Sequence, residues 1–271
     1  MEEQFNLFGQ STCFSYLCNM KKYGLIGKKL GHSLSKEWFE RMFLREGICD
    51  AEYQTYEMPS LKRLPQWVLQ EGMRGLNVTI PYKEEIIALL EHADSVAEEI
   101  GAVNCVEVVG GKLIGHNTDA PAFARTLQPL LQPWHTRALV LGTGGASKAV
   151  AYALKQLGIS HSFVSRTPQG QHRTICYAEA LAQVADIYLI VNCTPVGMFP
   201  NTQASPWPIT PCLSSKHLCY DLIYNPTKTR FLQEAELCGA HIANGLDMLE
   251  RQAQLSWQIW SGGRPTPNSC P

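Results

Sequence analysis

A lysine close behind a proline is the first residue whose position suggests chemistry. Lys83 follows Pro81 in "RGLNVTIPYKEEII", and the next residues, "EEIIALLEHA", have helical composition and spacing. Proline suits the first position of a helix because its missing N–H would have no partner there. We therefore predict that Lys83 lies in the first turn of a helix, where a positive charge is unfavourable and an amine suits proton transfer. A solvated surface lysine is the simpler alternative for this stretch taken alone.

A cluster of glycines predicts a nucleotide-binding turn. Gly142, Gly144 and Gly145 lie in "VLGTGGASKAVAYAL", between an expected strand and an expected helix. Glycines let a backbone approach a pyrophosphate, and a helix N-terminus favours the anion. The match is G-x-G-G, because Ser147 occupies the last glycine position of the dinucleotide-binding pattern. A tight strand–helix connection is the alternative.

The end of the following strand favours NADP over NAD. An NAD site of this kind has an acid about 20 residues beyond the glycines, which bonds the ribose 2′-OH. The stretch "VSRTPQG" has Ser165, Arg166 and Thr167 there and no acid. A guanidinium pairs well with phosphate oxygens, so Arg166 suits a 2′-phosphate. An exposed loop arginine is the alternative.

The elements that must position these residues alternate between strands and helices, which indicates an α/β fold with mostly parallel sheets. The stretch "NCVEVVGGKLIGHNTD" differs, because Gly110-Gly111 between two short apolar runs predicts a hairpin. In the first half we expect a strand at 22–27, a helix at 35–47 with Ser35 as N-cap, a strand at 51–58, a helical region at 61–72, a strand at 75–80 and the hairpin at 104–119.

A second alternating series begins near Arg137 and ends in a long helix. In that closing helix Leu249, Ala253, Trp257 and Trp260 share one face. We expect strands at 137–142, 160–167, 188–194, 218–224 and 240–245, with helices at 146–158, 178–187, 228–239 and 247–260.

Composition excludes several classes of function. The chain has 271 residues, which is long enough for two domains of moderate size, and it has a net charge of −1 without blocks of like charge. Neither nucleic acid nor a membrane surface is therefore expected as a partner, and no apolar run could span a bilayer. The ten cysteines are scattered and no C-x-x-C or H-E-x-x-H occurs, so we expect no metal and a cytoplasmic protein. The first residues, with two acids and no sustained apolar core, argue against a secretory signal.

The motifs together resemble one family. From Met20 to Trp260 the chain contains "GHSLS", "NVTIPYK", "GAVNC", "GHNTD", "GTGGASKA", "SRT", "NCTPVGM", "YDLIYNP" and "GLDMLERQAQ", in the order of the shikimate dehydrogenase family. The resemblance implies an α/β substrate domain at 20–120, completed by a C-terminal helix at 246–261 that returns to it. It also implies a Rossmann-like, doubly wound NADP-binding domain at 121–245. Residues 1–19, which match no motif, and 262–271 are expected to be disordered tails, and a chain starting at Met20 should keep its activity.

The implied reaction is the reversible NADPH-dependent reduction of 3-dehydroshikimate to shikimate, in the biosynthesis of chorismate and the aromatic amino acids. The resemblance assigns Lys83 and Asp119 to catalysis, as a pair that shares a proton. It assigns the substrate contacts to Ser33, Ser35, Thr79, Lys83, Asn104, Asp119, Tyr224 and Gln252. It assigns the cofactor contacts to Gly142, Thr143, Gly144, Gly145, Ala146, Ser165, Arg166, Thr167, Thr194, Met198, Leu222 and Gly245.

Some positions depart from the family pattern. Lys29 and Lys36 stand where proline is common, Cys105 where threonine is usual, and Gly170 where a lysine would add a second contact to the 2′-phosphate. Two alternatives therefore stay open, a quinate/shikimate dehydrogenase that uses NAD and a ligand-binding homologue without turnover. The substrate partner is a small molecule in either case, and the chain is expected to be a monomer or a homodimer.

Overall fold

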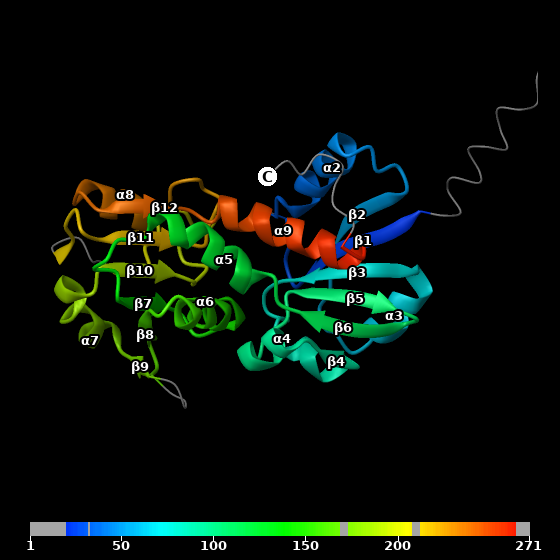
Figure 1. Ribbon diagram of the computed structural model, residues 1–271, viewed down its shortest axis with the longest axis horizontal. Coiled ribbons are helices and arrows are strands. Elements are labelled where there is room, and N and C mark those ends of the chain that lie inside the picture. Colours follow the sequence, from blue (N-terminus) through cyan, green and yellow to red (C-terminus); the bar gives the residue numbers. More distant parts are fainter. Residues whose placement is uncertain (1–19, 32, 169–172, 208–211, 264–271) are drawn as a thin grey trace, which may run out of the picture.

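The computed structural model describes residues 20–31, 33–168, 173–207 and 212–263, which form two sheets side by side along the long axis of the molecule (Figure 1). The predicted tail at 1–19 and all but the first residues of the one at 262–271 lie outside the described residues. None of the described helices is long and apolar enough to cross a membrane. The described cysteines are free thiols.

The first sheet, sheet A, is mixed and has the strand order β2-β1-β3-β5-β6-β4. Strand β1 pairs in parallel with both neighbours, whereas β5 is antiparallel to β3 and β6. The predicted hairpin between β5 and β6 is confirmed, because Gly110 and Gly111 both have positive φ angles, as a two-residue turn requires. The strands are β1 (Lys21–Gly27), β2 (Ala51–Glu57), β3 (Met73–Val78), β4 (His92–Ala93), β5 (Cys105–Val109) and β6 (Lys112–His116), and the helices are α2 (Ser35–Arg45), α3 (Leu64–Glu71) and α4 (Ser95–Ile100).

The predicted helix after Pro81 is wrong. Lys83 lies in a turn, and only a short 3₁₀ helix, η1 (Glu85–Leu89), follows it. The backbone beyond η1 pairs instead with β6, where Glu91 N–H donates to the Leu113 carbonyl. Pairing with the sheet therefore overrides the helical propensity of this stretch. Lys83 is therefore not part of the first turn of a helix.

The predicted N-cap at Ser35 is also wrong. Helix α2 begins at Ser35 and its N-cap is Leu34, which makes no side-chain cap. The hydroxyl of Ser33 accepts the Ser35 N–H at 3.2 Å and donates to the Ser35 hydroxyl at 3.1 Å. The two serines are thus adjacent at the start of this helix.

The second sheet, sheet B, is wholly parallel, with the order β12-β11-β10-β7-β8-β9. This order reverses direction between β7 and β10, as in a doubly wound nucleotide-binding sheet, so the α/β prediction is confirmed. The strands are β7 (Arg137–Leu141), β8 (Ser160–Val164), β9 (Thr174–Ile175), β10 (Leu189–Asn192), β11 (Leu218–Asp221) and β12 (His241–Ala243), and the helices are α6 (Gly145–Gln156), α7 (Tyr177–Leu181) and α8 (Arg230–Leu237).

Sheet B is covered by helices on both faces. Successive strand residues point to opposite sides, so each strand contributes side chains to both cores. Val140 and Val191 pack into a core with α6, whereas Leu139 and Ile190 pack into another core with α8. Strand residues buried on both faces are typical of a parallel sheet between two helix layers. In a sheet of this kind a ligand binds in the crevice at the carboxyl ends of β7 and β10, the paired strands at which the order reverses.

Two helices connect the sheets. Helix α9 (Leu246–Trp260) contributes Met248 to a core beside sheet B, and Ala253 and Trp257 to the core of sheet A (Figure 1). Helix α5 (Asp119–Leu127), which the sequence analysis did not expect, follows the hairpin and packs on α6 and α9. The C-terminal helix therefore returns to the first sheet, whereas the exact domain limits at 120 and 245 stay predictions.

Candidate active site

The shortest contact of the site joins Lys83 and Asp119. The Lys83 Nζ donates to Asp119 Oδ2 at 2.6 Å, and the two side chains are 16% and 7% exposed. Asp119 is the first residue of α5, so the partial positive charge of a helix start acts on the carboxylate and favours it. Asn117 fixes that helix start by accepting the Ala120 N–H at 3.1 Å.

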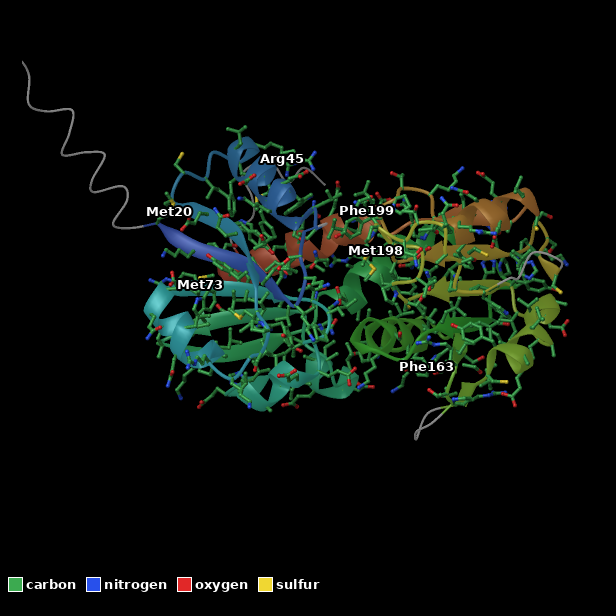
Figure 2. The ribbon with its side chains drawn as sticks, turned by 180° about the vertical axis from the view of Figure 1, so that it is seen from behind. Met20, Arg45, Met73, Phe163, Met198 and Phe199 are labelled. Carbon is green, nitrogen blue, oxygen red and sulfur yellow. The ribbon has the colours of Figure 1, made fainter. Side chains whose placement is uncertain are left out.

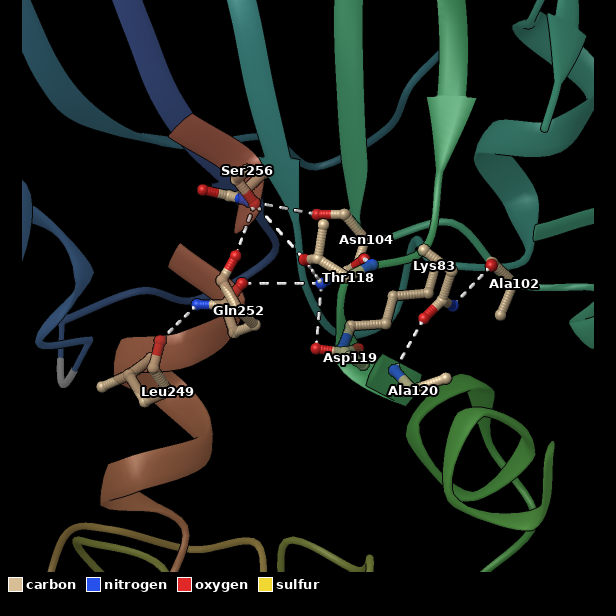
Figure 3. A network of polar contacts seen from close by, with 11 residues as sticks. Lys83, Ala102, Asn104, Thr118, Asp119, Ala120, Leu249, Gln252 and Ser256 are labelled. Atoms are coloured by element: carbon tan, nitrogen blue, oxygen red, sulfur yellow. Dashed lines mark hydrogen bonds and ion pairs between the residues drawn. The ribbon is translucent and has the colours of Figure 1, made fainter. Parts of the chain in front are cut away.

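Asn104 orients the same carboxylate from the other side. Its Nδ2 donates to Asp119 Oδ1 at 2.9 Å and to Thr118 Oγ1 at 2.8 Å, and its Oδ1 accepts the Thr118 N–H at 2.7 Å (Figure 3). Gln252 Oε1 lies 3.5 Å from the same amide nitrogen. Both oxygens of Asp119 therefore have donors, and the carboxylate is fixed in one orientation.

A buried polar chain ties this centre to α9. Ser256, on α9, accepts from Asn77 Nδ2 at 2.8 Å and lies 3.3 Å from Thr118 Oγ1 (Figure 3). Tyr53 donates its hydroxyl to Asn77 Oδ1 at 2.9 Å. The sequence analysis missed Asn77, Thr118 and Ser256. Ser256 had a signal, because it lies one turn after Gln252 in an otherwise apolar stripe.

A cleft of about 700 Å³ lies over this centre, between the two sheets. Tyr224 lines the cleft from the side of sheet B and Ser33 from the side of sheet A, and burial raises the pKa of Tyr224 although the influence of Ser33 lowers it. The cleft brings together all the residues assigned to the substrate, namely Ser33, Ser35, Thr79, Lys83, Asn104, Asp119, Tyr224 and Gln252.

Only part of the residues assigned to the cofactor lines this cleft. Met198 lies near the middle of the molecule, on the side of sheet B that faces sheet A (Figure 2). The members of the set that line the cleft are Ala146, Thr194, Met198, Leu222 and Gly245. Those outside its lining are Gly142, Thr143, Gly144, Gly145, Ser165, Arg166 and Thr167, which follow strands β7 and β8.

The turn after β7 fits a dinucleotide. Gly142 has a φ of +101°, and its N–H donates to the Val164 carbonyl at 2.9 Å, which brings the glycine turn beside the strand that leads to Arg166. A Cβ on Gly144 would meet no other atom within 4 Å, so the approach to the start of α6 is open. Arg166 is exposed and makes no ion pair with another described residue. These groups could hold a pyrophosphate and a 2′-phosphate.

The glycine turn also contacts Lys83. A Cβ on Gly145 would lie 2.9 Å from the Cβ of Lys83 and 3.3 Å from that of Ala102. The start of α6 therefore packs directly on Lys83, and any side chain at position 145 would displace it. This contact was not evident from the sequence.

Other reactive groups near the site do not suit catalysis. Burial raises the pKa of the Cys105 thiol to about 12, so it stays neutral beside Ser256. Burial likewise raises the pKa of Cys193, which lines the cleft. Within the described part of the chain, no group of His, Cys, Asp and Glu could hold a metal ion.

Comparisons with known proteins agree with this geometry. Residues 25–106 match the model of the shikimate dehydrogenase substrate binding domain. The NADP(+) shikimate dehydrogenase of Caldicellulosiruptor saccharolyticus is 39% identical to the chain, over 89% of this chain and 92% of that protein. The crystal structure of shikimate dehydrogenase 1 from Peptoclostridium difficile has a TM-score of 0.82 at 33% identity, over 92% and 94% of the two chains. That of shikimate 5-dehydrogenase from Thermus thermophilus with NADP(H) and shikimate has a TM-score of 0.80 at 35% identity, over 90% and 94%.

Proposed function

Since the chain belongs to the shikimate dehydrogenase family, we propose that it catalyses the reversible NADPH-dependent reduction of 3-dehydroshikimate to shikimate. The observation that carries the proposal is the 2.6 Å contact between Lys83 and Asp119 within the cleft between the two sheets. Its chemistry matches the reaction, because the reduction of a ketone requires a proton donor beside the carbonyl oxygen and a fixed ring.

Lys83 and Asp119 act as one proton-transfer unit in this proposal. During reduction, the pair gives a proton to the oxygen that becomes the ring hydroxyl, and during oxidation it takes that proton back. NADPH, when bound, supplies the hydride that adds to the ring carbon. Asn104 holds Asp119 in the orientation that this exchange requires, because its amide occupies the second carboxylate oxygen.

The substrate residues surround the unit from both sheets. Ser33 and Ser35 present adjacent hydroxyls that suit a carboxylate, and Tyr224 lines the same cleft from the side of sheet B. Thr79, Asn104 and Gln252 provide a hydroxyl and two amides near Lys83, which suit the ring hydroxyls. This placement would orient the ring with its carboxylate at Ser33 and its reacting carbon at Lys83.

The residues assigned to the cofactor fall into two groups, one for its phosphates and one that lines the cleft. We assign the glycine turn, Gly142 to Ala146, to the pyrophosphate, and Ser165, Arg166 and Thr167 to the 2′-phosphate of NADP. Thr194 and Met198 line the cleft and would lie close to the nicotinamide, and Leu222 and Gly245 line it and would contact the cofactor. Within the proposal, the domain limits, the monomer or homodimer, the cytoplasmic location and the lack of a nucleic-acid, membrane or metal partner stay predictions.

A matrix of initial rates tests the proposal. Shikimate and quinate are each combined with NADP and NAD, and the absorbance of the reduced nicotinamide is recorded. Shikimate with NADP should give the highest kcat/KM. A preference for quinate with NAD would favour the first alternative, and no turnover in any combination would favour a ligand-binding homologue.

A further inference from the structure

A buried carboxylate outside the cleft lies where two of its loops meet. Asp221 is the last residue of β11, is 0% exposed and pairs in register with Asn192, the last residue of β10. Its Oδ1 accepts from Asn192 Nδ2 at 3.0 Å and from the Ile223 N–H at 3.0 Å. Its Oδ2 accepts from Thr229 Oγ1 at 2.6 Å. Asp221 does not line the cleft, so neither catalysis nor ligand contact explains it.

Through Asn192, the carboxylate fixes the loop after β10. Asn192 Oδ1 accepts from the Thr194 N–H at 3.0 Å and from the Thr194 hydroxyl at 2.7 Å. Because Asn192 donates to Asp221 with its other end, the amide cannot flip without losing these bonds. Thr194 and Met198 of this loop line the cleft.

Through Ile223, the same oxygen fixes the loop after β11. The bond to the Ile223 N–H holds the turn in which Leu222, Ile223 and Tyr224 line the cleft. The Gly245 N–H in turn donates to the Ile223 carbonyl at 3.2 Å, at the start of α9. One carboxylate oxygen therefore holds the loops on both sides.

Burying the Asp221 carboxylate costs free energy, which stabilisation of the fold alone does not explain. A fully buried carboxylate loses its hydration, and its three partners are an amide, a hydroxyl and a backbone N–H, with no ion pair to any described cation. A residue needed only for packing at this place would be apolar. What the carboxylate provides is an acceptor for two loops at one point.

We propose that Asp221 is a positioning residue, whose Oδ1 aligns Thr194 on one side of the cleft with Tyr224 on the other, so that cofactor and substrate are held in register. The inference rests on the proposed function, because it assigns Thr194 to the nicotinamide side and Tyr224 to the substrate side. The residue itself touches neither ligand.

Three variants of the full chain separate positioning from stability. Asp221→Ala removes the acceptor for both loops, and a misplacement of about 1 Å can cost about 10²-fold in rate, so we expect kcat to fall about tenfold or more. Asp221→Asn keeps an oxygen toward both loops and turns its NH₂ toward Thr229, so kcat should stay within about threefold of the wild type. Thr229→Val removes the donor to Oδ2 together with the side-chain cap of α8, and neither bond reaches the two loops, so it should lower the melting temperature without changing kcat or either KM.

Hydrogen exchange provides a readout without turnover. The amides of residues 192–198 and 222–225 should exchange faster in Asp221→Ala than in the wild type, and at the wild-type rate in Thr229→Val. If the wild type failed to oxidise shikimate, the proposed function would fail while this measurement still tested Asp221. If Asp221→Ala does not fold, Asn192→Ala breaks only the arm to Thr194 and should raise the KM for NADP while leaving that for shikimate within about twofold.

Several results would overturn the inference. The first is an Asp221→Ala variant with the kcat and the amide exchange of the wild type, and the second is an equal loss of kcat in Asp221→Ala and Thr229→Val. The third is an Asp221→Asn variant whose kcat falls as far as that of Asp221→Ala. The last is an Asn192→Ala variant that changes the KM for NADP and the KM for shikimate by the same factor. Each would mean that Asp221 supports the fold without aligning the loops.

Discussion

The Asp119 carboxylate is held by donors of different kinds. Lys83 occupies one oxygen with a charged amine, and Asn104 occupies the other with a neutral amide. A carboxylate between two such donors cannot rotate to follow one of them without losing the other. At the scale of the residue, Asn104 therefore fixes the orientation of Asp119 and Lys83 provides the opposite charge, so substitutions of Asn104 and Lys83 can separate the two effects.

Arg166 should decide the preference for NADP. A hydrogen bond to a charged group contributes about 1.5–3 kcal/mol, or about one to two factors of ten in discrimination. Arg166→Ala should therefore lower kcat/KM for NADP by that amount and hardly change it for NAD. Arg173→Ala is the matched control, because Arg173 is the other exposed arginine close to this loop in the sequence. Equal losses for both cofactors in Arg166→Ala would show that Arg166 does not contact the 2′-phosphate.

The Asp221 carboxyl should make stability depend on pH. Burial raises its pKa from 3.8 to about 6, although the bonds from Thr229, Ile223 and Asn192 act in the opposite direction. The folded state then binds this proton more tightly than the unfolded state, so the contribution to stability is full below pH 3.8 and is lost as the pH rises through 6. Asp221→Asn does not titrate there, so its free energy of unfolding should rise relative to the wild type between about pH 4 and about pH 8, by at most about 3 kcal/mol. Urea denaturation of both proteins at these two pH values measures the difference in their free energies of unfolding. A difference that does not change with pH would contradict the prediction.

At the scale of the elements, the sequence predicted the alternation of strands and helices because short apolar runs, such as those of β7 and β10, alternate with segments of helical spacing, such as α6 and α9. The helix after Pro81 could not be rejected from local pattern, because its competitor is pairing with β6, a contact made through the tertiary fold. Helix α5 was missed because its first residue, Asp119, was assigned to the end of the hairpin.

The residues of the candidate site could be predicted from the sequence one by one, but the hydrogen-bond network that joins them could not. Resemblance identified Asn104, Asp119 and Gln252 separately. Their connection through Thr118 and Ser256 depends on how α9 packs on β3 and β5, and no spacing in the sequence specifies that. The same holds for the contact of Gly145 with Lys83.

Gly75 should matter for the attachment of α9. A Cβ at this strand position would overlap the indole ring of Trp260, whose nitrogen donates to the Val106 carbonyl at 2.9 Å. Overpacking of this kind costs about 1–3 kcal/mol, so Gly75→Ala should lower the free energy of unfolding by that amount. Gly31→Ala is the matched control, because its Cβ would meet nothing within 4 Å. Equal stability of both variants in urea denaturation would show that Trp260 moves aside without cost.

At the scale of the whole molecule, the two sheets should approach each other around bound ligands. The residues that we assign to the substrate lie mainly on the side of sheet A and those that we assign to the cofactor on the side of sheet B, and the chain passes between the two sides at the starts of α5 and α9. We expect hinges near residues 119–121 and 244–247, since closure excludes water and brings the hydride donor to the ring. Solution scattering with both NADP and shikimate should give a smaller radius of gyration than either ligand alone. An unchanged scattering profile would argue against a large movement.

The assignment of Lys83 and Asp119 as one catalytic unit is tested by the initial rate of NADP reduction with shikimate in the wild type, Lys83→Ala, Asp119→Ala and the double variant. General acid–base groups contribute about 10²- to 10⁴-fold, so Lys83→Ala should lower kcat by that factor and change the KM for shikimate much less. The double variant should be little slower than the slower single variant, because groups that act as a unit are not additive. Turnover of Lys83→Ala close to that of the wild type would contradict the assignment.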